Sequence, residues 1–286
     1  MKKTLQLPRF DVLLDTDCAN PSNNAELTLT LRLGFRQINP AGGANTGTYN
    51  DYGSPTGQPR AIIKWSSSTW TAWKVAFCNS ARKFWHGKFW ILNTRGVLPF
   101  KHGQQVFLPN IWCKFDIVHS DASAGTYHHA IDVVRLAPSE TWFGSHAQLY
   151  DSLDTNLVQK THNSAGKPIM QRAHVHEIGH LLGLGHVDVG KPHCPPTGNT
   201  NASACYGVSD HDKNSVMGSG MRLDTIHAEP WLTALTTILS TAPPLLLYTP
   251  PPILVKPFTA LKKRVYPRTT AEFEAGKVLT TLPPGR

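Results

Sequence analysis

The stretch HVHEIGHLLGLGHVD, residues 174–188, constrains this chain more than any other, because it places four histidines and one glutamate within fifteen positions. His176 and His180 are four residues apart, so on an α-helix their side chains lie on one face, one turn apart. Glu177 points to a neighbouring direction and can stand beside both imidazoles. His174 faces roughly the opposite side of such a helix, where we expect it to be solvated or to support the site from behind.

Gly183 predicts where this helix ends. It follows His180 by three residues, and a glycine there can adopt the left-handed conformation that stops a helix. The chain then turns back, so His186 can bring a third imidazole to the other two. Three histidines are the ligand set of a catalytic zinc ion, because they leave one coordination position open for water. Glu177 is the candidate base beside that water.

A second motif follows the histidines. The sequence NSVMGSGM places Met217 thirty-one residues after His186. The pattern H-E-x-x-H-x-x-G-x-x-H followed by a methionine turn is typical of metzincin metallopeptidases. This chain resembles them over roughly residues 25–240, most specifically over 176–186 and then over 215–218. In that family the turn passes beneath the three histidines as an apolar floor. Met221 is the alternative for this role, but the preceding Ser-Val pair favours Met217.

The resemblance to metzincins implies an α+β fold of the zincin type. A twisted, mostly parallel sheet with the active-site helix would form an upper lobe, and the third ligand, the methionine turn and a last helix would form a smaller lower lobe. The histidine motif is nearest to the matrixin branch, but Val187 replaces its usual serine and Asp188 comes one place too late for an adamalysin-like member. The subfamily therefore stays open. Ser219 stands where astacins and serralysins carry a tyrosine ligand, so no tyrosine ligand is expected from that motif.

The same resemblance implies a zinc-dependent endopeptidase that hydrolyses a protein or peptide substrate. Zn²⁺ would be held by His176, His180 and His186, with Glu177 as the general base. The substrate would lie extended along an edge strand, for which residues 146–155 are the candidate. The alternative is a catalytically silent, metzincin-like binding module. Glu177 argues against it, because a structural zinc ion needs no base and is normally closed by four protein ligands.

The loop after the third histidine contains further polar candidates. A metal-binding histidine usually has an outer partner for its second ring nitrogen, and Asp188, Asp210 and Asp212 are candidates for that role. His193 and His211 lie in the same loop. We interpret both as surface histidines, with oxyanion stabilisation or a second ion as the alternative.

Composition bounds the organisation of the chain. Its 286 residues are 40% hydrophobic and 16% charged, which suits one substantial core with extensions. We expect an irregular segment over 1–24, a catalytic domain over 25–241, and a proline-rich basic tail over 242–286. The net charge is +9, of which the seven basic and two acidic residues of 256–286 contribute +5. A solvated tail is the simplest interpretation, and nucleic-acid binding by the tail is the alternative.

Targeting signals and cysteines indicate little about location. The apolar run TLQLP is too short for a secretory signal, and no run of about twenty apolar residues predicts a membrane span. We therefore expect a cytoplasmic protein or export by a leaderless route. Cys194 and Cys205 flank a loop and either pair or stay reduced, depending on the compartment. Cys18, Cys78 and Cys113 are expected to be buried thiols.

Hydrophobic periodicity predicts the main elements. Strands are expected at 25–38, 111–120 and 128–137, with a weaker one at 146–155, and helices at 68–87 and 226–239. Ser68 or Thr69 is expected to cap the first helix, and Pro168 to begin the histidine helix. Residues 39–59, rich in Gly, Pro and Asn, are expected to form a long loop.

Overall fold

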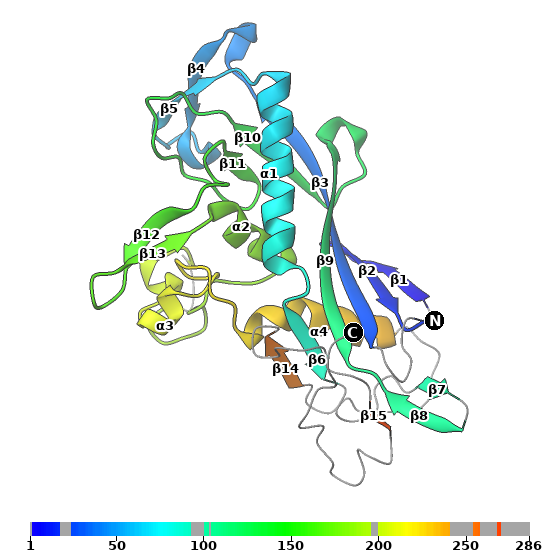
Figure 1. Ribbon diagram of the computed structural model, residues 1–286. Helices are drawn as coiled ribbons and strands as arrows, with labels where there is room; N and C mark the ends of the chain where they lie inside the picture. Colours follow the sequence, from blue (N-terminus) through cyan, green and yellow to red (C-terminus); the bar gives the residue numbers. More distant parts are fainter. Residues whose placement is uncertain are drawn as a thin grey trace. The chain divides into compact units, whose positions relative to one another are not determined.

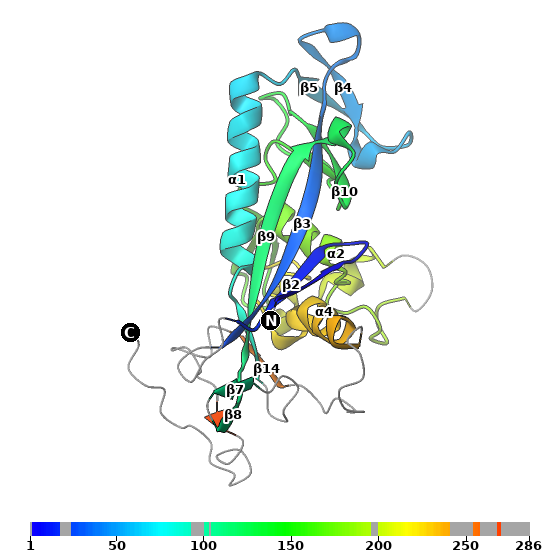
Figure 2. The same ribbon diagram turned by 90° about the vertical axis from the view of Figure 1, so that its right-hand side faces the viewer.

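The computed structural model describes residues 2–17, 24–92, 100–102, 104–195, 200–240, 254–257 and 268–269. The chain, whose helices and strands are labelled in Figure 1, divides into two compact units, and residues of the expected 25–241 domain fall into both. The first unit contains Met1–Thr30, Trp85–Asp116 and Asp224–Arg286, and the second contains Leu31–Phe84 and Ile117–Leu223. Two long strands, β3 (Ala25–Ile38) and β9 (Ile111–Asp121), contribute residues to both units and are neighbours in one sheet (Figure 2). Both strands confirm their sequence predictions.

The first unit contains strands in the order β1-β2-β3-β9-β6-β14. The bounds of the strands not yet given are β1 (Lys2–Gln6), β2 (Asp11–Asp15), β6 (Phe89–Leu92) and β14 (Leu254–Pro257). The prediction of an irregular segment over 1–24 is wrong for residues 2–15, which form the antiparallel hairpin β1–β2. Val12 and Leu14 are buried and alternate with less buried neighbours, as in a half-buried strand. That alternation is too short to stand out in the sequence.

The helix α4 (Glu229–Ser240) of the first unit confirms the helix expected over 226–239. It follows a short 3₁₀ turn, η5 (Thr225–Ala228). The Trp231 side chain is buried, packs against Phe89, and donates a hydrogen bond of 2.8 Å from its indole nitrogen to the carbonyl of Lys114. A separate small sheet has the order β15-β8-β7, from β7 (Phe100–His102), β8 (Gln105–Leu108) and β15 (Arg268–Thr269).

The second unit is built on the helix α1 (Ser67–Trp85), which belongs to it up to Phe84. Trp70, Trp73 and Phe77 follow helical spacing and surround Phe35 of β3 edge-on, with ring centroids 5.4–6.2 Å apart. The helix matches its prediction, but its cap does not. Ser66, rather than Ser68 or Thr69, accepts a hydrogen bond on its hydroxyl from the Thr69 amide at 3.2 Å.

Strand β10 (His129–Val134) lies parallel to β3 and to β11 (Leu149–Asp151). Parallel pairing is therefore found in the second unit, whereas β1, β2, β6 and β14 of the first unit pair antiparallel with their neighbours. The expected mixture of helices with a twisted sheet is present. Only three residues of the expected 146–155 strand are extended.

Two hairpins of the second unit were not expected. Strand β4 (Thr46–Asn50) lies within the predicted long loop and pairs with β5 (Pro59–Ile63), which begins at the last residue of that loop. The Gly and Pro residues of the loop lie largely in the turns. Strands β12 (Val158–His162) and β13 (Pro168–Gln171) pair directly before the histidine helix. Pro168 therefore begins a strand instead of the helix. Alternating burial over 168–171 marks that strand, which is too short to be distinguished from a helix start by sequence.

The remaining elements are short. They are the 3₁₀ turns η1 (Ala41–Gly43), η2 (Asp51–Gly53), η3 (Ala122–Ala124) and η4 (Ser203–Tyr206), and the helix α3 (Asp210–Lys213). Within the described residues, no helix combines the length and apolar character needed to cross a lipid bilayer. The predicted basic tail over 242–286 lies outside the described residues except for β14 and β15.

Candidate metal centre

The helix α2 (Ala173–Leu182) carries the first two histidines of the motif, and nearly all of its residues are buried. It ends as predicted at Gly183, which has a left-handed backbone with φ of 104°. The amide of Gly183 donates to the carbonyl of His180, and the amide of Leu184 donates to that of Gly179, each at 2.9 Å. This ending turns the chain back, so that His186 returns to the face of the helix that carries His180.

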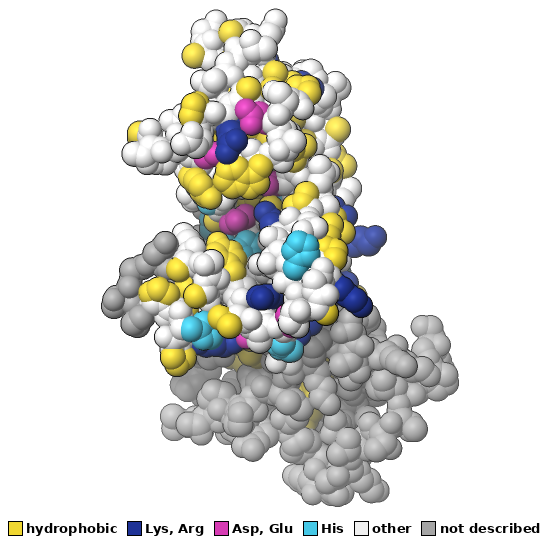
Figure 3. All heavy atoms as spheres, turned by 90° about the vertical axis from the view of Figure 1, so that its left-hand side faces the viewer, with side chains coloured by type: hydrophobic (Ala, Val, Ile, Leu, Met, Phe, Trp, Pro, Cys, Tyr) yellow, Lys and Arg dark blue, Asp and Glu magenta, His cyan; other side chains and the backbone are white. Residues whose placement is uncertain are grey.

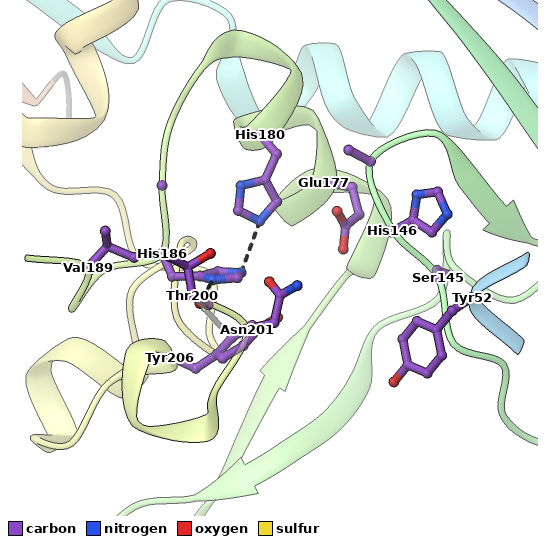
Figure 4. Close-up of a pocket in the computed structure, with 12 residues that line it drawn as sticks. Tyr52, Ser145, His146, Glu177, His180, His186, Val189, Thr200, Asn201 and Tyr206 are labelled. Carbon is purple, nitrogen blue, oxygen red and sulfur yellow. Dashed lines mark hydrogen bonds between the residues drawn. The ribbon is translucent and has the colours of Figure 1, made fainter. Parts of the chain in front are cut away.

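The three predicted ligand histidines meet at one point. The Nε2 atom of His180 lies 3.1 Å from Nε2 of His176 and 3.0 Å from Nε2 of His186. In Figure 4 a dashed line joins His180 to His186 across the pocket. Two nitrogens at about 2.0–2.1 Å from a tetrahedral zinc ion are roughly 3.3 Å apart. The spacing of the imidazoles is therefore close to that of a tetrahedral zinc site.

Hydrogen bonds on the far side of each ring decide which nitrogen faces this point. Nδ1 of His176 donates to the carbonyl of Val216 at 2.7 Å. Nδ1 of His180 donates to Leu184 and Nδ1 of His186 donates to Thr200, each at 2.8 Å. Because a carbonyl only accepts, Nδ1 carries the proton in each neutral ring and Nε2 presents its lone pair. The expected outer partners, Asp188, Asp210 and Asp212, do not take this role.

Three lone pairs converging on one point favour a cation between them. Among the described residues, His176, His180 and His186 form the group of three metal-binding side chains whose ligand atoms lie within 4.8 Å of one another. Burial lowers the pKa of all three, that of His186 to about 4 and that of His176 well below its usual range. The rings are thus neutral at pH 7, as metal binding requires. The donor set fits zinc.

Glu177 lines the same cavity, which has a volume of about 770 Å³. Figure 4 shows its carboxylate between His180 and His146, directed into the pocket and apart from the point where the imidazoles meet. Burial, and then the charge of Asp154, raises the pKa of Glu177 to about 8. The carboxylate is thus placed to hold or release a proton near neutral pH.

A buried polar cluster lies behind α2 and was not predicted. One carboxylate oxygen of Asp154 accepts from the Ser145 hydroxyl at 2.6 Å and from the Asp151 amide at 2.8 Å. The Asp154 carbonyl accepts from Nδ1 of His174 at 2.9 Å, and the other ring nitrogen of His174 contacts the Ser80 hydroxyl. His174 is therefore buried instead of solvated, and it supports the helix from behind.

The predicted methionine turn is a tight turn that contacts the histidines through its backbone. The amide of Gly218 donates to the carbonyl of Ser215 at 3.0 Å, and the Met217 side chain is buried. Val216 provides the carbonyl that accepts from His176, and the amide of Val187 donates to the Met217 carbonyl at 2.9 Å. The turn is therefore hydrogen-bonded to His176 directly, and to His186 through the adjacent residue Val187.

Gln171, the last residue of β13, holds this turn in place and was missed by sequence reasoning. Its buried amide nitrogen donates towards the carbonyls of Val216, Gly218 and Gly220 at 3.3, 2.9 and 3.1 Å. A Cβ added at Gly218 or Gly220 would lie within 2.4 Å of a backbone oxygen, so these positions require glycine. A polar residue at the end of a short strand is no signal by itself, because only the fold brings it to the turn.

The candidate aspartates instead shape the loop after the third histidine. Asp188 is fully buried and accepts from Nε2 of His193 at 2.7 Å and from the Val208 amide at 3.0 Å. Lys191 bridges Asp188 and Asp212, and these contacts lower the pKa of both carboxyls. Asp210 accepts from Ser164, and His211 is exposed, as expected. These contacts hold the loop together away from the three imidazoles.

The structure pairs Cys194 with Cys205 in a disulfide. The loop it closes contains Thr200, whose carbonyl orients His186. Tyr206, which follows Cys205, packs against His186 with the two ring centroids 3.9 Å apart. This contact was not predicted from the sequence because Tyr206 lies outside the motif. Burial is the main cause that raises the pKa of Tyr206, to about 12. Cys78 and Cys113 are buried thiols as predicted, and Cys18 lies outside the described residues.

The chain was compared with protein-family models, with curated proteins and with solved structures. It matches none of them. The histidine motif and the geometry of the site are therefore the features that point to a function.

Proposed function

We propose that this protein is a zinc-dependent endopeptidase of the metzincin type. The observation that carries the proposal is the convergence of three neutral imidazoles, from His176, His180 and His186, beside a carboxylate in one open cavity. A site that holds a metal through three side chains has room for water at the fourth position. Glu177 lies on the same helix as His176 and His180, and its carboxylate points into the cavity beside them.

The residues of the chain have distinct roles in the proposed reaction. Zinc bound at the three Nε2 atoms would polarise the peptide carbonyl and lower the pKa of a bound water towards ~7. Glu177 accepts a proton from the attacking water and later donates it to the leaving amine. The carbonyls of Val216, Leu184 and Thr200 keep the imidazoles oriented. A Ser or Cys nucleophile is not needed, because water attacks directly.

The alternative is a metzincin-like module that binds zinc without catalysis. A purely structural zinc site is normally closed by a fourth protein ligand. Here the carboxylate of Glu177 lines the cavity beside the histidines. Burial destabilises the charged form of this carboxylate and so raises its pKa. A protein that only binds zinc gains nothing from a buried carboxylate of this kind. We therefore favour the catalytic alternative.

The test is the substitution Glu177→Gln in the full, zinc-loaded chain. Glutamine keeps the shape of the side chain but cannot accept the proton, so we expect cleavage of casein or a quenched peptide library to fall by about 10²–10⁴. Zinc content, measured by elemental analysis, should stay at the wild-type level. Glu229→Gln, at an exposed position of α4, is the matched control and should cleave normally. Equal cleavage by the wild type and Glu177→Gln would exclude the mechanism.

A further inference from the structure

Two exposed aromatic rings of the second unit meet each other, and one of them lines the cavity. Tyr52 and Trp142 are the aromatic members of the exposed large hydrophobic side chains in the part of the chain that the structure describes, with 55% and 48% exposure. Their ring centroids are 6.3 Å apart in an edge-to-face arrangement. Tyr52 lines the cavity that contains Glu177 and His180. On the face in Figure 3, histidine and acidic side chains lie in a hollow beside hydrophobic side chains.

The backbone at Tyr52 adopts an unfavourable conformation to hold its ring there. With φ of 58° and ψ of 9°, it is the non-glycine residue with a positive φ among the described residues. Tyrosine is disfavoured in this left-handed region, where Gly or Asn is the usual choice. The Tyr52 amide donates to the carbonyl of Gly144 at 2.9 Å, and a Cβ at Gly144 would lie 2.7 Å from the tyrosine ring. Such strain persists at sites where a side chain is needed in one position.

One buried carboxylate connects the supports of both rings. Asp51 is 2% exposed, accepts from the Gly144 amide at 2.9 Å, and accepts from Nε of Arg60 at 2.8 Å. The Arg60 guanidinium lies over the Trp142 ring, 5.0 Å from its centroid. Both rings are therefore held by the same set of contacts before any ligand arrives. Rings fixed in this way lose little conformational entropy when they bind.

We propose that Tyr52 and Trp142 form a subsite that selects a bulky apolar or aromatic side chain of the peptide substrate. This inference rests on the proposed endopeptidase function and names the substrate class of the same site. Exposed ring faces attract apolar groups and cations. The Arg60 guanidinium already lies over the Trp142 ring, where ion pairs with Asp51 and Glu140 hold it. That cation-binding face of Trp142 is therefore occupied, whereas an apolar substrate side chain can cover the exposed parts of both rings.

The experiment measures binding separately from cleavage. The full, zinc-loaded Glu177→Gln protein is titrated with fluorescent peptides that differ at one scanned position, which carries Phe, Leu, Ala or Lys. We expect one position at which the Phe or Leu peptide binds about tenfold more tightly than the Ala peptide. Adding Tyr52→Gly, which accepts the left-handed backbone and so preserves folding, should reduce this ratio to about one. Trp142→Ala should reduce it as well.

Two controls separate recognition from a general loss of structure. Tyr52→Phe keeps the ring and should keep the apolar preference. Val118→Ala removes an exposed apolar side chain of β9 and should change nothing. Unchanged ratios in Tyr52→Gly and Trp142→Ala, a preference for Lys, or no measurable binding of any peptide would overturn the subsite. An intact apolar preference in a wild-type protein that cleaves no peptide would instead overturn the proposed function and leave the subsite standing.

Discussion

At the scale of single residues, the outer hydrogen bond of each ligand histidine is decisive. The carbonyls of Val216, Leu184 and Thr200 hold a proton on Nδ1 of the three rings, so each Nε2 can bind a cation. Aspartates were the expected partners. A carbonyl fixes the same ring nitrogen without adding a negative charge, and it leaves Glu177 as the carboxylate that lines the cavity beside the ligands.

Asp151 tests how the burial of a carboxyl group changes its pKa and the stability of the fold. Burial, followed by the charge of Asp154, raises its pKa from 3.8 to about 8. The folded chain therefore binds more protons than the unfolded chain between these values, so ionisation of Asp151 lowers stability as the pH rises through this window. In metal-free protein, we expect Asp151→Asn and the wild type to have the same melting temperature at about pH 4. At pH 8.5 the melting temperature of Asp151→Asn should be at least ~2 °C higher than that of the wild type.

Thermal melts followed by circular dichroism across this pH range check the prediction. Asn can still accept the hydrogen bond that Asp151 receives from the Leu153 amide. Asp121→Asn is the control, because that side chain is 73% exposed and gains little from losing its charge. A difference between Asp151→Asn and the wild type that is the same at pH 4 and pH 8.5 would contradict the argument.

At the scale of elements, the site depends on segments that lie outside the histidine motif. Strand β13 precedes α2 directly and ends with Gln171, which donates to three carbonyls of the turn around Met217. One of these carbonyls, that of Val216, also orients His176. The strand, the helix and the turn thus form one hydrogen-bonded assembly, which explains why a polar side chain is buried at the end of a hairpin.

The substitution Gln171→Leu tests this assembly. Leucine fills similar space but cannot donate, so the turn carbonyls lose a buried partner. We expect a loss of about 1–3 kcal/mol in the free energy of unfolding, measured by denaturant titration, and weaker zinc binding. Gln159→Leu, at an exposed position on the paired strand β12, is the matched control and should be close to neutral. Gln171 would have no such role if both variants behaved alike.

At the scale of the whole molecule, the three converging histidines, Glu177 and Met217 all belong to the second unit. Zinc that binds the folded unit and not the unfolded chain stabilises it by mass action. At a free concentration of 100 times Kd this amounts to about 2.7 kcal/mol, which corresponds to a rise in melting temperature of roughly 2–4 °C for each kcal/mol. None of the residues that the structure describes in the first unit belongs to this site.

Scanning calorimetry with zinc and with a chelator measures this stabilisation. We expect zinc to raise the melting temperature of the wild type and to leave that of His180→Ala nearly unchanged, because the variant retains two of the three ligands. If the two units unfold in separate transitions, zinc should raise the melting temperature of the transition in which α2 unfolds. An equal shift in the wild type and in His180→Ala would show that zinc acts elsewhere on the chain.

The convergence of the three histidines was predictable from the sequence because it depends on local geometry. Spacings of four and six residues around a helix, with Gly183 ending it, bring three imidazoles together through α2 and its C-terminal turn alone. Long elements with strong periodicity, such as α1 and β3, were predictable for the same reason. Short strands in hairpins were not, because they are specified by their pairing partner more than by their own residues.

The surroundings of the site were decided only by tertiary structure. Gln171, Asp154 and Tyr206 contact the motif from segments whose proximity depends on the fold, and no pattern in the sequence marks them. The pairing of Tyr52 with Trp142 spans ninety positions of the chain. Local spacing determines which side chains a helix presents in one direction. Only the packing of distant segments decides what faces them, because such contacts depend on the whole course of the chain.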